Sequence, residues 1–206
     1  MKLKPLIAAL AFAAAASAQA QTVFRMDFEQ LDDLQEVADF YDGNGGPDYG
    51  ATFSLDSLAV KSDDFGGSGS FSGQQGENAL IFLQGSAVVT VQSGFTTAVS
   101  FLYSAQTGAN ASVRIFDANG NLLNPDNTAL GSTGNDVWGT FSFSFVGTAK
   151  SLQFGGAGNQ VVFDNLTIGY GNPLGDLPPP IPEPSTYGLV LLGLAGVVAV
   201  ARRRRA

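Results

Sequence analysis

Strict alternation of apolar and polar residues in several short stretches limits the fold of this chain more than any other feature. In the clearest stretch, Phe141, Phe143 and Phe145 alternate with Ser142 and Ser144. This pattern predicts a strand with one buried face and one face toward water. Other stretches with period two, or short apolar runs, bounded by Gly, Asn, Asp and Ser, predict the other strands. The predicted strands are residues 23–28, 51–55, 58–60, 79–83, 87–91, 98–103, 112–116, 138–146, 151–154 and 161–170.

A series of short strands with almost no helical periodicity predicts an all-β fold, an antiparallel β-sandwich of jelly-roll type. Two facing sheets would give the many phenylalanines of this region a shared interior. The sequence Asp-Ala-Asn-Gly-Asn at 117–121 predicts a tight turn centred on Asn119-Gly120. The one helical spacing in this region predicts one or two helical turns, and its apolar residues are Leu31, Leu34, Val37 and Ala38.

The first twenty residues have the three parts of a secretory signal peptide. Lys2 and Lys4 form the charged start, residues 6–16 form the apolar run, and Ala18-Gln19-Ala20 forms a small-residue cleavage site. An alanine tract of this kind has little reason to exist as a core helix. We therefore expect signal peptidase to remove residues 1–20, so that the mature chain begins at Gln21.

The C-terminal end carries a second apolar run, residues 187–201, which is followed by four consecutive arginines. It is shorter than the roughly 20 residues that span a bilayer comfortably, although flanking residues can extend its reach. Four arginines after an apolar run are expected to stay in the cytoplasm. The predicted organisation is a signal peptide at 1–20, a β-sandwich ectodomain at 21–172, a Pro-rich linker at 173–184, a single short transmembrane helix at 185–201 and a cytoplasmic tail at 202–206.

The end of the chain resembles a known sorting signal. Pro182, Glu183 and Pro184 precede a short Leu/Val/Gly/Ala run. The arginines that follow this run are Arg202, Arg203, Arg204 and Arg205. This order resembles the PEP-CTERM sorting signal of Gram-negative bacteria. The resemblance implies transient anchoring in the inner membrane, recognition by an exosortase, cleavage near the Pro-Glu-Pro motif and delivery to the cell surface or extracellular matrix. That family is associated with exopolysaccharide production and biofilm formation.

The middle of the chain resembles, more loosely, the ectodomains that often accompany this signal. Such domains resemble β-sandwiches related to carbohydrate-binding modules, which raises the expectation of glycan contact without naming a site. The stretches that carry the resemblance are residues 39–43, 49–53, 94–97, 101–104 and 163–167.

Charge and composition remove several functional classes. Residues 22–176 hold 17 acidic and four basic side chains, a formal charge of −13, so nucleic acid is not an expected partner. The chain has no His and no Cys, which removes Ser-His-Asp triads, Cys nucleophiles and His-ligated zinc. Glycoside hydrolysis needs only two carboxylates, but nothing in the sequence marks a pair. We therefore expect a protein that is not an enzyme.

Three acidic residues suggest a structural calcium site. Asp27 and Glu29 end the first predicted strand, and Asp164 lies in the last one. Jelly rolls commonly place their first and last strands near one another, and oxygen ligands from two such strands suit Ca²⁺. The alternative is that these carboxylates are exposed at strand ends or bind backbone amides.

A sugar site needs an aromatic platform with polar neighbours. Trp138 begins a strand directly after the loop at 131–136, which suits a rim position, and Tyr49 is a further candidate ring. The alternative for Trp138 is packing in the core. Taken together, the sequence predicts an exported surface or matrix protein associated with exopolysaccharide. The alternatives are a calcium-dependent carbohydrate-binding module and a glycoside-active enzyme, and the glycan is left open.

Overall fold

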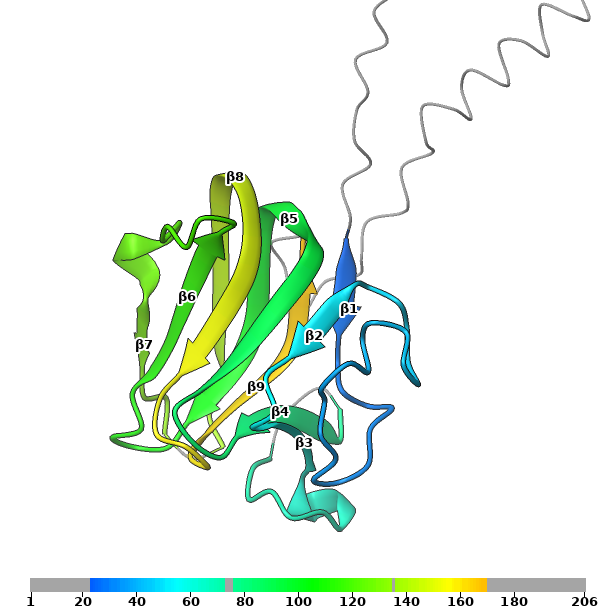
Figure 1. Ribbon diagram of the computed structural model, residues 1–206. Helices are drawn as coiled ribbons and strands as arrows, with labels where there is room; N and C mark the ends of the chain where they lie inside the picture. Colours follow the sequence, from blue (N-terminus) through cyan, green and yellow to red (C-terminus); the bar gives the residue numbers. More distant parts are fainter. Residues whose placement is uncertain (1–22, 73–75, 135, 170–206) are drawn as a thin grey trace, which may run out of the picture. The chain divides into compact units, whose positions relative to one another are not determined.

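The computed structural model describes residues 23–72, 76–134 and 136–169 of the 206-residue chain. Apart from two short 3-10 turns, η1 (Asp63–Phe65) and η2 (Pro125–Asn127), its regular elements are all strands (Figure 1). The strands are β1 (Phe24–Met26), β2 (Ala51–Phe53), β3 (Ser57–Lys61), β4 (Asn78–Phe82), β5 (Ser86–Ala105), β6 (Ala111–Asp117), β7 (Ala129–Gly131), β8 (Gly139–Gly155) and β9 (Val161–Ile168).

All strand pairs are antiparallel, and the long strands β5 and β8 take part in two layers. The first half of β8 and the second half of β5 join β9, β4, β3 and β1 in what we call the β9 layer. The first half of β5 and the second half of β8 join β2, β6 and β7 in the β6 layer. The predicted all-β antiparallel sandwich is therefore confirmed.

The two layers are continuous because β5 and β8 bend together at one end of the sandwich (Figure 1). The β5–β8 register shifts between Thr90 and Phe95 and again between Thr96 and Thr97, as expected where bulges bend a sheet. Gly94 has a φ of 75°, and a Cβ there would lie 2.7 Å from Thr148 Cγ2. Only glycine fits this corner without strain.

The main core lies between the layers and is rich in phenylalanine. The rings of Phe101 in β5, Phe154 in β8 and Phe163 in β9 meet pairwise, with centroids 4.5–5.6 Å apart. Such edge and tilted arrangements add to the gain from burying the rings. A smaller cluster lies outside this core and contains Val60, Phe71, Ala79, Ile81 and Val162.

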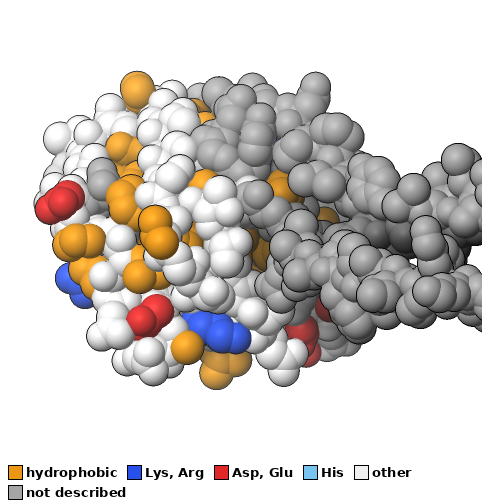
Figure 2. Space-filling view, turned by 90° about the horizontal axis from the view of Figure 1, so that it is seen from above, with side chains coloured by type: hydrophobic (Ala, Val, Ile, Leu, Met, Phe, Trp, Pro, Cys, Tyr) orange, Lys and Arg blue, Asp and Glu red, His pale blue; other side chains and the backbone are white. Residues whose placement is uncertain are grey.

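The acidic excess does not form a single patch on the end of the domain that is visible in Figure 2. In this view from above, Asp and Glu side chains are scattered among uncharged polar and apolar ones.

Along β8, Val146 at the bend is 96% exposed, whereas Phe141 is buried and Phe143 and Phe145 are half-buried. Ser142 and Ser144 are exposed, so the predicted alternation is confirmed.

The structure corrects the prediction of helical turns at Leu31–Ala38. Leu34 and Ala38 have positive φ values of 61° and 35°, and the segment bonds to β3 instead. The amides of Leu34 and Val37 donate to the carbonyls of Ala59 and Ser57. Backbone pairing with a neighbouring strand therefore outweighs the helical spacing of the side chains. By contrast, the predicted turn is confirmed, since Asp117 Oδ1 accepts from Asn119 N and Asn121 N at 2.8 Å.

The predicted signal peptide, linker, membrane helix and Arg tail lie outside the described residues. Within the parts of the chain that are described, no helix is long and apolar enough to cross a membrane.

Candidate functional site

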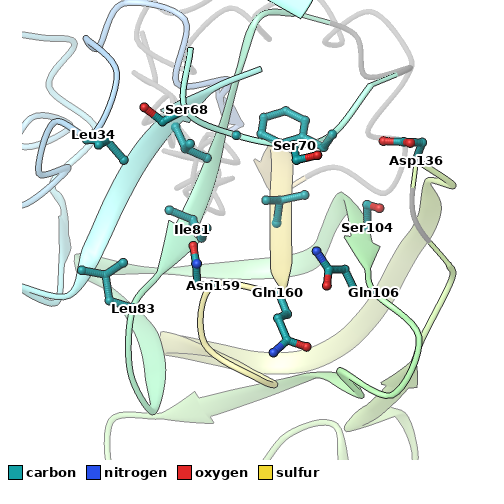
Figure 3. A pocket seen from close by; sticks show the side chains of 14 residues that line it. Leu34, Ser68, Ser70, Ile81, Leu83, Ser104, Gln106, Asp136, Asn159 and Gln160 are labelled. Atoms are coloured by element: carbon teal, nitrogen blue, oxygen red, sulfur yellow. The ribbon is translucent and has the colours of Figure 1, made fainter. Parts of the chain in front are cut away.

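A hollow of about 220 Å³ lies on the outer face of the β9 layer, and we call it the amide hollow (Figure 3). Its floor is a row of side chains from three neighbouring strands. Ile81 in β4 pairs with Val162 in β9, which in turn pairs with Ser104 in β5. Alternation places these side chains on one face, so the floor is apolar at its centre and becomes polar toward β5.

One wall is the segment 62–72, which several hydrogen bonds fasten to its surroundings. The amide of Gly69 donates to the carbonyl of Lys61 at 2.8 Å, and Ser68 Oγ donates to Asp33 Oδ2 at 2.6 Å. The same carboxylate accepts from the Lys61 amide through Oδ1 at 2.8 Å. A wall that is held at both strand and loop keeps its shape before a ligand arrives, which reduces the cost of ordering on binding.

Asp136 and Trp138 hold the end of this wall at Ser72. Asp136 Oδ1 accepts a hydrogen bond from Ser72 N at 2.9 Å, and Trp138 Nε1 donates to Ser72 O at 2.7 Å. Trp138 also meets Phe71 edge to face, with ring centroids 6.0 Å apart. Thr133, which precedes these residues in the chain, is bonded to the end of β5, because the Ala105 amide donates to Thr133 Oγ1 at 2.9 Å.

Three side-chain amides, Gln106, Asn159 and Gln160, stand around the hollow in exposed positions. Gln106 follows β5, and Asn159 and Gln160 precede β9 (Figure 3). Among the described residues, none of these amide groups has a hydrogen-bond partner, although their backbones are bonded: Gln106 N donates to Gln160 O at 3.0 Å. Each free amide offers donors and an acceptor to a ligand.

The predicted calcium residues are neighbours but have different surroundings. Asp164 is 1% exposed, and burial raises its pKa to about 8, with smaller contributions from the charges of Glu29 and Asp27. Glu29 accepts hydrogen bonds from the amides of Glu77 and Asn78 at 3.0–3.1 Å. Within residues 23–72, 76–134 and 136–169, no group of three or more acidic side chains is placed to hold a metal ion. Calcium binding stays a prediction.

The two predicted sugar-contacting rings both pack against other rings. Trp138 is half-buried and lies against the smaller apolar cluster, beside the amide hollow but outside its lining. Tyr49 is half-buried and stacks on Phe24 at 4.7 Å and on Tyr41 at 5.9 Å between centroids. No contact with a sugar is tested, so these roles also stay predictions.

The predicted sorting and processing residues all lie outside the described part of the chain, so the structure places none of them. They are Pro182, Glu183, Pro184, Arg202, Arg203, Arg204 and Arg205. Their individual roles in processing stay predictions.

The lining amides were missed by sequence reasoning because they occupy turns with no motif. Asn159 gave one usable signal: it stands in a Gly-rich turn, where it adopts a φ of 59°, a conformation that Asn tolerates better than most residues. The pairing of this turn with the end of β5, through which Gln106 joins the same site, is a long-range contact that no local pattern reports.

Comparison with solved structures finds several distant matches. The K2 cleaved adhesin domain of Lys-gingipain is 14% identical with a TM-score of 0.45, covering 72% of this chain and 98% of that one. A family 29 carbohydrate-binding module is 11% identical with a TM-score of 0.42, covering 77% and 99%. CBM35 from Paenibacillus barcinonensis is 16% identical with a TM-score of 0.39, covering 71% and 97%. At these values we draw no functional conclusion from the likeness.

Comparison of sequences finds no curated protein that matches the chain. Residues 180–205 match the family model of the PEP-CTERM protein-sorting motif, in agreement with the order of Pro-Glu-Pro, apolar run and arginines. The chain therefore carries a PEP-CTERM protein-sorting motif at its C-terminal end, which marks it as an exported, exosortase-processed protein that passes through a membrane.

Proposed function

We propose that this exported protein binds a carbohydrate without acting on it, through the amide hollow, and that it serves at the cell surface or in an exopolysaccharide matrix. The observation that carries the proposal is a set of three side-chain amides around the apolar floor of Ile81 and Val162. These amides belong to Gln106, Asn159 and Gln160, and none has a hydrogen-bond partner in the part of the chain that the structure describes. Sugars present hydroxyl groups at their edges and C–H groups on their ring faces. Amides and an apolar floor complement these two surfaces.

The volume of the hollow limits the size of the ligand. This volume of about 220 Å³ lies below the roughly 300–1,000 Å³ of pockets for drug-sized molecules. A single sugar unit, at a chain end or as a side branch, fits this space better than an extended polymer. Phe71, which lines the hollow, is only 5% exposed, so it supports the wall and offers little ring surface for stacking.

A binding experiment with the full-length chain tests the site. We expect affinity electrophoresis through neutral polysaccharides to retard the wild-type chain on at least one of them. Gln106→Ala and Asn159→Gly should each weaken binding by about three- to tenfold, the value of one or two hydrogen bonds. Glycine is chosen at position 159 because it accepts the positive φ. Gln92→Ala removes an exposed amide elsewhere and should change nothing.

Three results would redirect the proposal. Indifference to every neutral glycan, including the host's own polysaccharide, would favour a purely structural matrix role. Equal weakening by Gln92→Ala would move binding away from the hollow. Release of reducing ends from the polymer would identify a glycoside-active enzyme.

Processing at the two ends is tested by the intact mass of the protein recovered outside cells. We expect the loss of residues up to about Ala20 and beyond about Pro182 if signal peptidase and an exosortase both act. A C-terminus that remains intact in the inner membrane would instead indicate a permanent anchor, with the sandwich held at the periplasmic face.

Calcium at Asp27, Glu29 and Asp164 is a further part of the proposal. The burial of Asp164 beside two other carboxylates supports it, because a cation there would offset their mutual repulsion. Glu29 is already bonded to two backbone amides, so Asp27 and Asp164 are the better ligand candidates. Calcium should raise the melting temperature at pH 7.5 and a chelator should lower it. An unchanged melting temperature in both solutions would contradict calcium binding.

A further inference from the structure

A second hollow lies on the outer face of the β6 layer, and we call it the arginine hollow. It shares no lining residue with the amide hollow. Its volume is about 370 Å³. The hollow forms where Gly155 in β8 pairs with Ser86 in β5 on one side and with Ser112 in β6 on the other. Because glycine has no side chain, this row has a gap at its centre. A Cβ at Gly155 would lie 2.6 Å from Ser112 Oγ.

The next row on the same face supplies the recognition groups. Gln153 in β8 pairs with Arg114 in β6, two residues along from the Gly155 row. Gln153 is fixed by a hydrogen bond from its Nε2 to Ser86 Oγ at 3.0 Å, which leaves its Oε1 as an acceptor. The hollow thus combines a guanidinium, an amide and two hydroxyl groups, and no acidic residue lines it among those described.

Arg114 differs from the other basic side chains of the described domain. Lys61 forms an ion pair with Glu77 at 2.8 Å, Lys150 Nζ donates to Gln92 O, and Arg25 Nε donates to Thr167 Oγ1 at 3.4 Å. Arg114 is exposed, and among the described residues it has neither an ion pair nor a hydrogen bond. An unpaired arginine is unusual in a domain with a formal charge of −13.

We propose that the arginine hollow binds an acidic sugar, with the carboxylate of a uronic acid unit on Arg114 and its hydroxyl groups on Gln153, Ser86 and Ser112. The planar guanidinium matches a carboxylate with two parallel hydrogen bonds. The flanking hydroxyl and amide groups complement sugar hydroxyls, which a simple inorganic anion lacks. This site goes beyond the neutral-sugar site proposed above and does not depend on it.

The net negative charge of the domain does not prevent this contact. Charges on the surface are screened beyond about 8 Å at physiological ionic strength, so the anion responds mainly to groups within the hollow. The domain's charge instead makes nonspecific attraction of acidic polymers weak. Binding of an acidic sugar therefore has to come from a defined site.

Isothermal titration calorimetry on the full-length chain tests the proposal, with oligogalacturonate as the probe and an uncharged galactose oligomer as the neutral partner. We expect oligogalacturonate to bind and Arg114→Gln to weaken it by about tenfold or more, the loss of charge-assisted hydrogen bonds. The affinity of Arg114→Lys for oligogalacturonate should lie between those of the wild-type chain and Arg114→Gln, because lysine keeps the charge without the planar guanidinium. Any binding of the neutral oligomer should be unaffected by Arg114→Gln.

A matched charge control is Lys150→Gln, which removes one positive charge from the same domain at another position. It should leave oligogalacturonate binding unchanged. Absence of binding to the wild-type chain at millimolar probe, equal losses in Arg114→Gln and Lys150→Gln, or full binding by Arg114→Gln would each overturn the proposal. Gln106→Ala separates the two proposals, since it should weaken only the neutral sugar; its failure to do so would count against the amide hollow alone.

Discussion

The amide hollow and the arginine hollow lie on opposite outer faces of one sandwich, yet they are built differently. The amide hollow has an apolar floor on strands and polar groups on loops, held by the contacts of Ser72 with Asp136 and Trp138. The arginine hollow takes most of its polar groups from three adjacent strands, β5, β8 and β6, and exists because Gly155 leaves a gap between two serines. Loops shape one site, whereas a missing side chain shapes the other.

This difference predicts which of the two hollows is more sensitive to damage in the local packing. Groups on loops are only as well placed as the contacts that hold the loops, whereas groups within a continuous sheet are placed by the ladder of backbone hydrogen bonds. Damage to local packing should therefore affect the amide hollow first. The following experiments start with the largest expected effect.

Titration of Asp164 should change the stability of the β9 layer more than any other single event. Burial raises the pKa of Asp164 to about 8 in the folded protein. At pH values between the pKa of this group in the unfolded chain and about 8, the folded state therefore binds more protons than the unfolded state. The free energy of unfolding should fall as pH rises, by on the order of 3 kcal/mol between pH 4 and pH 7. Urea unfolding in chelator at several pH values measures this slope.

Asp164→Asn should flatten that slope, and Asp126→Asn, an exposed acid, should keep it. A wild-type stability that rises between pH 5 and pH 7.5 would contradict the buried, protonated carboxyl group.

Trp138→Ala should remove the contact with Phe71 and the hydrogen bond to Ser72, and so loosen the wall of the amide hollow. Because Trp138 is only half-buried, we expect a loss of about 2 kcal/mol, below the roughly 3–5 kcal/mol of a fully buried aromatic ring. Neutral-sugar binding should weaken, while oligogalacturonate binding should not. Lost sugar binding at unchanged stability would instead assign Trp138 a direct contact with the ligand.

Gly155→Ala should fill the arginine hollow, since the new methyl group would meet Ser112 Oγ. We expect oligogalacturonate affinity to fall by about tenfold, with a change in stability of about 1 kcal/mol or less. Calorimetry with both probes measures the outcome. Unaltered affinity for oligogalacturonate would show that the gap is not where the sugar lies.

Arg114→Gln should have the smallest effect on folding, within about 0.5 kcal/mol, because the side chain is exposed and no described residue pairs with it. A clear loss of stability in urea unfolding would mean that Arg114 supports the sheet. In that case the comparison between a loop-built and a strand-built site would no longer hold.

The sequence predicted the strands well where side-chain alternation was regular, as in β6. It missed how they join: residues 87–91 and 98–103 proved to be parts of β5, and two predicted strands merged into β8. The β5–β8 register shifts near Gly94 and Gly147, where both strands bend, and the pairing resumes beyond the bend. The short strand β7 was missed because Ala129–Gly131 has no apolar pattern. The hollows escaped prediction because register, which decides which side chains become neighbours, is set by long-range pairing.

The position of β9 has a mechanical consequence. Its end at Ile168 pairs with Phe24 in β1, the first strand of the domain. At the other end of β9, Val162 lines the amide hollow, and Asn159 and Gln160 lie just before the strand. If the protein is tethered through its C-terminal side while a sugar is held in that hollow, tension runs along β9. β9 is hydrogen-bonded to β5 on one side and to β4 and β1 on the other. These hydrogen bonds would then all resist the sliding of β9 at the same time, instead of opening one after another.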